Sequence, residues 1–554
     1  MLSRRKFVTT SAATLAATSS GLFTALAPKA FAATASTLNI DLVNNTGNNT
    51  VYAYVTGHPL DNSNLWFLLE ADGQTPYYPT SPSSTGSPLQ ANCSIPLSAS
   101  GGAATRITVP HLAGARIWFS IGAPLTFLLN PGPALVEPSV SNNSDPNIAI
   151  PWDFCEFTFN SAQLFANISF VDFTCIPIAL QLTGSGGSQS APGLPVGGLD
   201  TLCTALAAQS AADGQGWNQL IVTSGGKNLR ALSPNNGIVI NPSLFSGYFN
   251  NYLSQVWSKY SSQTLSIDTQ ASWGTVTGQV SGGVLNFPGI GSFAQPSSAD
   301  IFSCNSGPFN VSGAEIGAVV ARLTAALNRT TLLIDTNQPD GEVPANYYKF
   351  AQTNHYARLV HSISLDGRGY AFPYDDVAPT GGADQSGAVA DPNPTLLTVT
   401  LGGVTSGGSG GGSGGSTVSA FSTIQAESYS SQSGTQTETT TDTGGGEDVG
   451  YIGNGDWLGY ANVDFGSGGA TQFHARVASG AATGVSGLVQ VALDSPSAAP
   501  VSSFAIANTG GWQSWETVPA NMTKVTGVHT VYLTFASGQS ADFVNVNWFT
   551  FLAS

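Results

Sequence analysis

Hydrophobic residues along the chain gather in short runs of β-branched and aromatic side chains, separated by clusters of Gly, Pro, Asn and Ser. Examples of such runs are Leu38–Val43, Ile117–Ile121 and Leu396–Leu401. Short apolar runs bounded by turn-forming residues are typical of β-strands. The pattern therefore predicts a protein that is mainly β along most of its length.

Two stretches instead carry apolar residues at helical spacing, which predicts a few helices besides the strands. Asn241-Pro242 precedes a run of aromatic residues from Phe245 to Tyr260, and proline is favoured at the first position of a helix. Ser312 and Glu315 have the spacing of a capping box before an apolar run that begins at Ile316. We expect a helix to begin at each of these places.

A Gly/Ser-rich segment divides the chain at residues 401–419. Such a composition forms a flexible tether, because it offers few side chains that pack. It predicts a large domain at 36–400 and a smaller unit at 420–554, both rich in β-strands.

The first 32 residues have the three parts of a secretory signal. Arg4-Arg5 is followed by a mildly apolar stretch and then by Ala30-Phe31-Ala32. The paired arginines are typical of the twin-arginine route, by which bacteria export folded proteins. We therefore expect residues 1–32 to be removed and the protein to be secreted.

Composition narrows the classes of partner. Only 9% of the 554 residues are charged, and the formal net charge is −16. A chain with so few clustered bases is a poor binder of nucleic acid, and its charge opposes an anionic membrane surface. The composition favours an extracellular β-protein that meets a neutral polymer, and we expect the protein to be a monomer.

Five cysteines precede the Gly/Ser segment, and none has the spacing of a metal site. Their number is odd, so at least one is unpaired within the chain. Export is compatible with one or two disulfides, whose pairing the sequence leaves open. The five are Cys93, Cys155, Cys175, Cys203 and Cys304.

Candidate chemistry lies in two acidic residues embedded in apolar, strand-like sequence. Glu156 lies in WDFCEFTFN (152–160) and Asp172 in NISFVDF (167–173), and no Lys or Arg occurs between residues 117 and 226. Hydrolysis of a glycosidic bond usually needs two carboxyl groups with different tasks. A purely structural role, with distant Arg or backbone N–H groups as partners, is the alternative.

Strand geometry places Glu156, Thr158 and Asn160 on one face. If the two segments pair as a hairpin, Glu156 and Asp172 lie roughly opposite one another. Closely opposed carboxyl groups favour retention of configuration, and a wider offset favours inversion, so this pattern leaves the stereochemistry open.

Other ionisable residues have a structural interpretation. Asp375 and Asp376 are adjacent, and adjacent acids on a strand point to opposite faces, so we expect structural or groove-edge roles. The histidines lack metal-ligand spacing and are expected to be hydrogen-bonded structural groups; they include His58, His111, His355 and His361.

WDFCEFTFN followed by NISFVDF resembles the active-site segment of glycoside hydrolase family 64, bacterial β-1,3-glucanases that release mainly laminaripentaose. Segments 294–309, 354–361 and 369–377 are also similar to that family. The resemblance implies a thaumatin-like fold, in which a β-barrel or sandwich and a mixed α/β lobe flank a wide groove.

The resemblance also implies roles for individual residues. Glu156 corresponds to the general acid and Asp172 to the general base of an inverting mechanism that needs no cofactor. Thr158 and Asn160 correspond to groove residues that hydrogen-bond sugar hydroxyls, and Phe165 stands where the family has a Trp.

The segment after the Gly/Ser run resembles carbohydrate-binding module family 6, a β-sandwich of the jelly-roll type. The similar stretches are 424–427, 450–460, 476–479, 509–512 and 545–549. The resemblance implies that Tyr451 and Trp512 flank a sugar-binding cleft, with Asn545 as a hydrogen-bond donor and Glu438 in its lining.

The same family pattern implies two further features of the module. Trp457 corresponds to a second sugar site on the face of the sandwich, with a core role as the alternative. A structural calcium ion is implied near the first and last strands, with oxygen ligands from Glu427, Gln425 and Asn547.

Three functions follow as hypotheses. The first is a secreted, endo-acting β-1,3-glucanase that the module holds on insoluble glucan. The second is a non-catalytic, thaumatin-like glucan-binding or antifungal protein. The third is a glycosidase for another neutral β-glucan or for xylan.

Overall fold

A computed structural model describes residues 34–61, 65–185, 187–382, 384–404, 418–421, 423–442, 447–466 and 468–553. The expected signal peptide and most of the Gly/Ser segment lie outside the described residues. The described chain forms two compact units, 34–404 and 418–553, each with its own hydrophobic core. The prediction of a mainly β protein with a minor helical part is confirmed.

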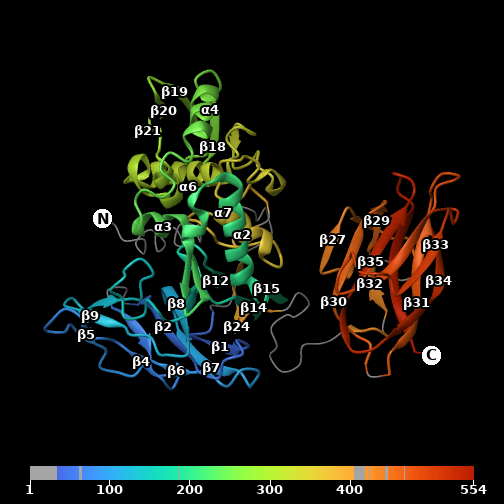
Figure 1. Ribbon diagram of the computed structural model, residues 1–554, viewed down its shortest axis with the longest axis horizontal. Helices are drawn as coiled ribbons and strands as arrows, with labels where there is room; N and C mark the ends of the chain where they lie inside the picture. The colour runs from blue at the N-terminus through green and yellow to red at the C-terminus, as the bar shows by residue number, and fades with distance from the viewer. Residues whose placement is uncertain are drawn as a thin grey trace, which may run out of the picture. The chain divides into compact units, whose positions relative to one another are not determined.

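Two sheets form the base of the larger unit (Figure 1). In the first, the strand order is β15-β14-β24-β1-β7, and the first and last strands of the unit, β1 and β24, pair in parallel. Its strands are β1 (Thr37–Asn44), β7 (Thr105–Pro110), β14 (Ile178–Gly184), β15 (Gly187–Ala191) and β24 (Pro394–Leu401).

The second sheet carries the candidate acid Glu156. Its strand order is β23-β12-β11-β8-β2-β3-β4, with β6 paired to β2. Its strands are β2 (Val51–Pro59), β3 (Phe67–Leu69), β4 (Pro76–Tyr77), β6 (Ile95–Pro96), β8 (Leu112–Ile121), β11 (Trp152–Phe159), β12 (Leu164–Ile168) and β23 (Ala388–Asp391). A small sheet of β5 (Ser87–Pro88), β9 (Leu128–Asn130) and β10 (Ala134–Val136) lies outside it.

The mixed lobe of the larger unit combines helices with short strands (Figure 1). Its helices are α2 (Gly198–Asp213), α3 (Pro234–Ile240), α4 (Asn250–Tyr260), α5 (Ser298–Ser303), α6 (Ala314–Arg329) and α7 (His355–Ile363). One sheet joins β13 (Phe173–Thr174), β17 (Lys227–Leu232) and β16 (Ile221–Ser224). The other joins β21 (Gly291–Ala294), β20 (Val284–Phe287), β19 (Thr275–Ser281), β18 (Leu265–Asp268) and β22 (Asn337–Gln338).

Both predicted helix starts are wrong in detail. The chain turns after Pro242, and α4 begins only at Asn250, because Gly247 adopts a left-handed φ of 71° that interrupts helical geometry. The cap of α6 is Gly313, without a side-chain hydrogen bond. The capping box belongs instead to α5. There the Ser297 side chain accepts a hydrogen bond from the backbone N–H of Asp300, and the Asp300 side chain accepts one from the backbone N–H of Ser297.

The cysteines form no disulfide in the described chain, so the expectation of one or two bridges is wrong. All five side chains are buried. Burial raises the pKa of the Cys175 thiol, which donates to the carbonyl of Leu229 at 3.0 Å. These residues therefore behave as small apolar groups of the core.

The smaller unit is a β-sandwich (Figure 1). One sheet contains β25 (Val418–Ser419), β27 (Ser431–Ser433), β30 (Trp457–Asp464), β32 (Gly487–Leu493), β33 (Ser502–Ile506) and β35 (Val528–Ser537). The other contains β26 (Ile424–Gln425), β28 (Gln436–Thr439), β29 (Glu447–Ile452), β31 (Ala470–Ser479), β34 (Gly511–Val525) and β36 (Val544–Leu552). The long strand β34 also pairs with β33, so it links the two sheets. No described helix of either unit is long and apolar enough to cross a bilayer.

Candidate active site

Glu156 belongs to a row of polar side chains that crosses four strands. In register, Thr56 of β2 faces Arg116 of β8, Arg116 faces Glu156 of β11, and Glu156 faces Asn167 of β12. Residues paired across neighbouring strands point to the same face of a sheet. The row therefore brings one cation beside a carboxylate on the same face of the sheet.

Arg116 holds Glu156 directly. Its Nε and Nη2 atoms donate to Glu156 Oε1 at 3.1 and 3.0 Å. The guanidinium also lies 4.3 Å from the ring centroid of Phe154. This cation–π contact helps to hold the guanidinium in place. Arg116 comes from β8, the neighbour of β11 in the sheet, so Glu156 has the distant arginine partner that the structural alternative describes.

Two further carboxylates share the charge of Arg116. Glu137 Oε2 lies 3.7 Å from Arg116 Nη1, and Glu137 Oε1 accepts from the hydroxyl of Thr56 at 3.3 Å. Burial works against the charge of Arg116, but Glu156, Glu137 and Asp172 outweigh it and raise the pKa of Arg116. Arg116 therefore lies among three acidic side chains.

Asp172 reaches this cluster from the loop between β12 and β13. Its carbonyl accepts from the backbone N–H of Ser233 at 3.0 Å and from Asn236 Nδ2 at 2.8 Å. Asn236 Nδ2 also lies 3.3 Å from Asp172 Oδ1. The N-terminal turn of α3 thus sets the position of this carboxyl group.

The predicted hairpin is therefore wrong in its register. β11 and β12 pair, but the residue opposite Glu156 is Asn167, and Asp172 lies beyond the end of β12. The two acids meet the same guanidinium from different parts of the chain, a strand and a loop. Because the two carboxyl groups are not directly opposite across the strands, the argument that they favour retention of configuration no longer holds.

A buried acid connects the two segments that carry Glu156 and Asp172. Asp153 of β11 accepts from the backbone N–H groups of Cys175 and Ile176 at 2.8 and 2.9 Å. Burial raises the pKa of Asp153 to about 7, against the lowering effect of these N–H groups. Asp153 lies three residues before Glu156, so its contacts fix β11 against the chain that follows Asp172.

A phenol lies close to the same site. Burial, together with the negative charges of Asp376 and Glu156, raises the pKa of Tyr370 well above its usual value. The carbonyl of Tyr370 accepts from the N–H of Phe170 at 2.8 Å, two residues before Asp172. Residues 369–377 therefore support the loop that carries Asp172.

The three expected sugar-binding residues lie at the same end of β11 and β12. Thr158 is partly exposed, and its Oγ1 accepts from the N–H of Gly114 at 3.4 Å. Phe165 pairs with Thr158 across the strands and is 38% exposed. Asn160 Oδ1 accepts from Ala162 N and Gln163 N, so this side chain also closes the turn between the strands.

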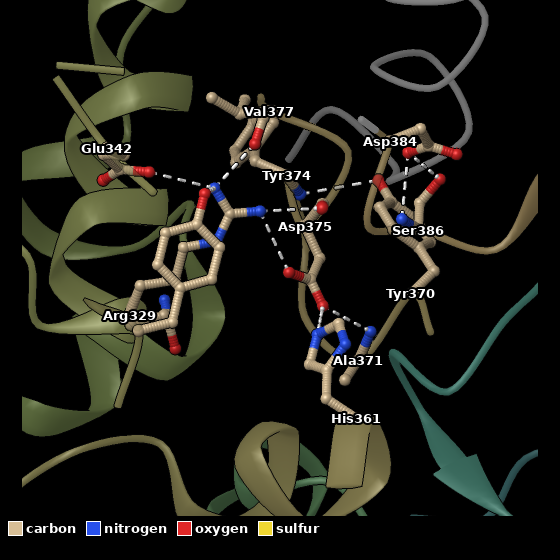
Figure 2. Close-up of polar contacts among 12 residues, drawn as sticks. Arg329, Glu342, His361, Tyr370, Ala371, Tyr374, Asp375, Val377, Asp384 and Ser386 are labelled. Atoms are coloured by element: carbon tan, nitrogen blue, oxygen red, sulfur yellow. Dashed lines mark hydrogen bonds and ion pairs between the residues drawn. The ribbon is translucent and has the colours of Figure 1, made fainter. Parts of the chain in front are cut away.

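Asp375 and Asp376 lie in a turn, so the strand premise for this pair is wrong. Asp375 is fully buried between Arg329 and His361 (Figure 2). Burial also raises the pKa of Asp376 to about 6. The other three singled-out histidines make hydrogen bonds to carbonyl or hydroxyl oxygens.

A family model for β-1,3-glucanases, glycoside hydrolase family 64, matches residues 36–401. The chain belongs to this family. It is a glycoside hydrolase with the β-1,3-glucanase type of catalytic unit, and family membership sets aside the non-catalytic alternative. A model for carbohydrate-binding module family 6 matches residues 425–553 of the same chain.

Individual proteins are similar to this family 64 enzyme over most of its length. A glucan endo-1,3-β-glucosidase of Cellulosimicrobium cellulans is 30% identical over 410 residues, which cover 72% of this chain and 70% of that protein. A laminaripentaose-producing β-1,3-glucanase, solved in complex with laminaritetraose, is 32% identical with a TM-score of 0.59. That match covers 66% of this chain and 99% of the solved one.

The module has relatives in other enzymes. Endo-1,4-β-xylanase A of Thermoclostridium stercorarium is 38% identical over 123 residues, which cover 22% of this chain and 23% of that protein. The similarity therefore concerns the module and not the catalytic unit.

Three of the expected cleft residues of the module lie together. Asn545 is buried, and its Nδ2 donates to Glu438 Oε1 at 2.7 Å and to the carbonyl of Trp512 at 3.1 Å. Gly450 packs against Asn545, which places the neighbouring Tyr451 at the same edge of the sandwich. Tyr451 and Trp512 are 51% and 37% exposed, so both rings are open to solvent.

Trp457, the expected second site, begins β30 and is partly buried. Its ring meets Tyr532 of β35 edge to face, with centroids 5.6 Å apart. This contact fixes the ring against the sheet and leaves part of its surface open.

The residues expected to bind calcium do not fit such a site. Asn547 is buried, and its Nδ2 donates to Asp442 Oδ2 at 2.8 Å, beside the ion pair of Asp442 and Arg476. Gln425 is exposed, and Glu427 has one buried oxygen without a hydrogen bond. No group of three acidic, His or Cys side chains in the described chain is placed to hold a metal ion. The implied calcium is not supported.

Asp448 is an acid of the module that the sequence analysis missed. It is buried beside the cleft, and Gln513 Nε2 donates both to Asp448 Oδ1 at 3.1 Å and to Glu438 Oε1 at 3.3 Å. Burial, opposed by the bond from Gln513 and reinforced by the charge of Glu438, raises the pKa of Asp448 to about 6.

We expect the stability of the module to depend on pH through Asp448. A carboxyl group whose pKa rises on folding from 3.8 to about 6 stabilises the fold below pH 3.8, and this contribution is lost as the pH rises through 6. Asp448→Asn, which mimics the neutral form, should flatten this decline and raise the module's Tm at pH 7. Calorimetry from pH 4 to pH 7 tests this, with Glu516→Gln, an exposed acid, as control. A lower Tm for Asp448→Asn at pH 7 contradicts it.

Proposed function

We propose that the protein is a secreted, endo-acting β-1,3-glucanase that cleaves the polymer with inversion and releases short oligosaccharides, laminaripentaose among them. Export by the twin-arginine route is part of the proposal. Its support is the placement of two carboxyl groups, Glu156 and Asp172, around Arg116 in a catalytic unit of family 64.

In the proposed reaction Glu156 donates its proton to the glycosidic oxygen as the bond from that oxygen to C1 breaks. Asp172 takes a proton from a water molecule, whose oxygen forms the new bond to C1 from the opposite face. The step balances: one water is consumed, Glu156 loses a proton and Asp172 gains one. Arg116 holds one oxygen of Glu156, so the other oxygen is the donor.

Substrate contacts are proposed for the end of β11 and β12. Thr158 and Asn160 hydrogen-bond sugar hydroxyls, and the open ring of Phe165 meets an apolar sugar face. The low net charge density of the chain suits a neutral polymer.

The module is proposed to hold the enzyme on insoluble glucan through Tyr451, Trp512, Asn545 and Glu438. Trp457 is proposed for a second contact. Tethering raises the local concentration of the catalytic unit on its substrate without any new contact at the active site.

Product analysis on curdlan tests the proposed function. We expect reducing ends to appear, oligosaccharides to accumulate before glucose, and the first-formed product to be the α-anomer when followed by proton NMR. Inversion of a β-linkage requires that anomer. An initial β-product contradicts inversion, and cleavage of xylan with curdlan left intact contradicts the proposed substrate.

A further inference from the structure

Tyr451 stands at an irregular point of the module. Its φ is +57°, in the left-handed region that side chains other than glycine rarely adopt. The pairing of β29 with β36 shifts register between Val449 and Ile452, so the strand bulges where Tyr451 lies. Strained backbone of this kind persists where the surrounding structure enforces it, often at binding sites.

A cavity of about 510 Å³ opens beside Tyr451. The turn 453–456 between β29 and β30 and the loop 537–542 between β35 and β36 form its other walls. Neither Asn545, Glu438 nor Trp512 lines it, so it is separate from the hydrogen-bonded cleft described above. Its volume is within the usual range for ligand pockets, about 300–1,000 Å³.

The two loops are held in place by their own hydrogen bonds. Asp456 Oδ2 accepts from the N–H of Gly453 at 2.7 Å, which closes the first turn. Gln539 Nε2 donates to the carbonyl of Gly484 at 3.0 Å, and Asn454 Oδ1 accepts from Ser537 N at 2.8 Å. The pocket walls are therefore formed before any ligand arrives, which lowers the entropic cost of binding.

Two polar groups of the pocket have no protein partner in the described chain. Asp542 is exposed and makes no hydrogen bond or ion pair, and the Nδ2 group of Asn454 donates to no described atom. One is an acceptor and the other a donor, beside an aromatic ring. Neighbouring hydroxyls of a pyranose need this combination, since each can donate one hydrogen bond and accept another.

We propose that this pocket is a second sugar subsite of the module, which binds a glucosyl unit of the chain held at Asn545 and Trp512. Asp542 accepts from one hydroxyl, Asn454 donates to its neighbour, and the Tyr451 ring meets the apolar face of the sugar. The two sites abut at Tyr451, because Gly450 beside it packs against Asn545. The inference rests on the proposed glucan binding by the module and extends it along the chain.

Length dependence of binding tests the subsite. Calorimetric titrations use the full chain carrying Glu156→Gln, in EDTA so that no divalent cation bridges the acids, with laminaritriose and laminarihexaose. Trp512→Ala identifies the part of each isotherm that belongs to the module. We expect Asp542→Ala and Asn454→Ala each to weaken that part about tenfold for laminarihexaose, as loss of a hydrogen bond to a charged or amide group implies, and to leave laminaritriose unchanged.

Two variants make the result specific. Asp542→Asn keeps the shape and one acceptor oxygen and should retain most of the affinity, whereas Glu516→Ala removes an exposed carboxylate elsewhere on the module and should change nothing. If Asp542→Ala binds laminarihexaose like Glu516→Ala while Trp512→Ala loses binding, the subsite is rejected, and glucan binding by the module at Trp512 is retained. If neither Asp542→Ala nor Trp512→Ala changes binding, glucan binding by the module is rejected as well.

Discussion

Replacing Glu156 by Gln should lower kcat on curdlan by about 10²–10⁴-fold, the range that a general acid contributes. The amide cannot donate the proton that the leaving oxygen needs. Its carbonyl oxygen still accepts from Arg116 Nε and Nη2, which now hold Glu156 Oε1 at 3.1 and 3.0 Å. The side chain should therefore keep its place, and affinity for curdlan should stay within about twofold because no sugar contact is removed.

Reducing-end assays and a depletion assay on insoluble curdlan measure the two quantities separately. Glu70→Gln is the matched control, since Glu70 follows β3 in the same sheet and is a partly buried acid outside the proposed site. Asp172→Asn should lose activity to a similar degree as the general base. Full activity of Glu156→Gln removes Glu156 from the proposed role, and loss of both activity and binding indicates a structural role instead.

The strand content could be predicted because it depends on local sequence, and the two candidate acids were singled out by the same local pattern. The run Leu38–Val43 alternates polar and apolar positions, and it forms most of β1 with Leu38, Ile40 and Leu42 buried. A carboxyl group among aromatic residues, as at Glu156, is costly to bury and therefore stands out.

The partners of those acids could not be predicted with the same method. Arg116 pairs with Glu156 across 40 residues of sequence, and Glu137 joins them from a loop. Such contacts depend on strand register, which turn geometry and the whole sheet decide. One signal was present: Arg116 is the lone charge in the strand LAGARIWFSI, and a lone charge in an apolar strand needs an opposite one.

The helix starts were missed for a related reason. Pro242 favours a helix locally, but the left-handed Gly247 breaks it before Asn250. Similarly, the predicted calcium ligands share a family pattern in sequence, whereas Asn547 is engaged by Asp442 of another segment. Local preference identifies candidate residues, and the tertiary contacts decide which of them act together.

Asp375 should be among the most costly residues of the catalytic unit to remove. Its carboxylate lies between Arg329 Nη2 at 3.2 Å and His361 Nε2 at 2.9 Å, and the side chains of Arg329 and Asp375 are both fully buried (Figure 2). Glu342 Oε2 approaches the same guanidinium at 3.3 Å. Asp375→Ala leaves the buried guanidinium of Arg329 with only one of its two carboxylate partners, Glu342. Removing one partner of a buried ion pair typically lowers the free energy of unfolding by about 3–5 kcal/mol.

The exposed pair of Arg368 and Asp366 provides the matched control. Its atoms approach to 2.8 Å, but the side chains are 28% and 24% exposed, and pairs of this kind contribute about 0–1 kcal/mol. Urea unfolding should therefore separate Asp375→Ala from Asp366→Ala by several kcal/mol in the transition of the catalytic unit. The transition of the module serves as an internal reference, because that unit has its own core.

The same substitution should also lower activity in protein that remains folded. Asp375 Oδ2 accepts from the N–H of Ala371 at 3.1 Å, and the adjacent Tyr370 holds Phe170 in the loop that carries Asp172. Loosening this chain of contacts displaces the proposed base, so kcat should fall more than KM changes under conditions where circular dichroism shows native structure. If Asp375→Ala unfolds with the same free energy as Asp366→Ala, the buried network does not stabilise the catalytic unit. If it is destabilised but fully active when folded, Asp172 is positioned by α3 alone.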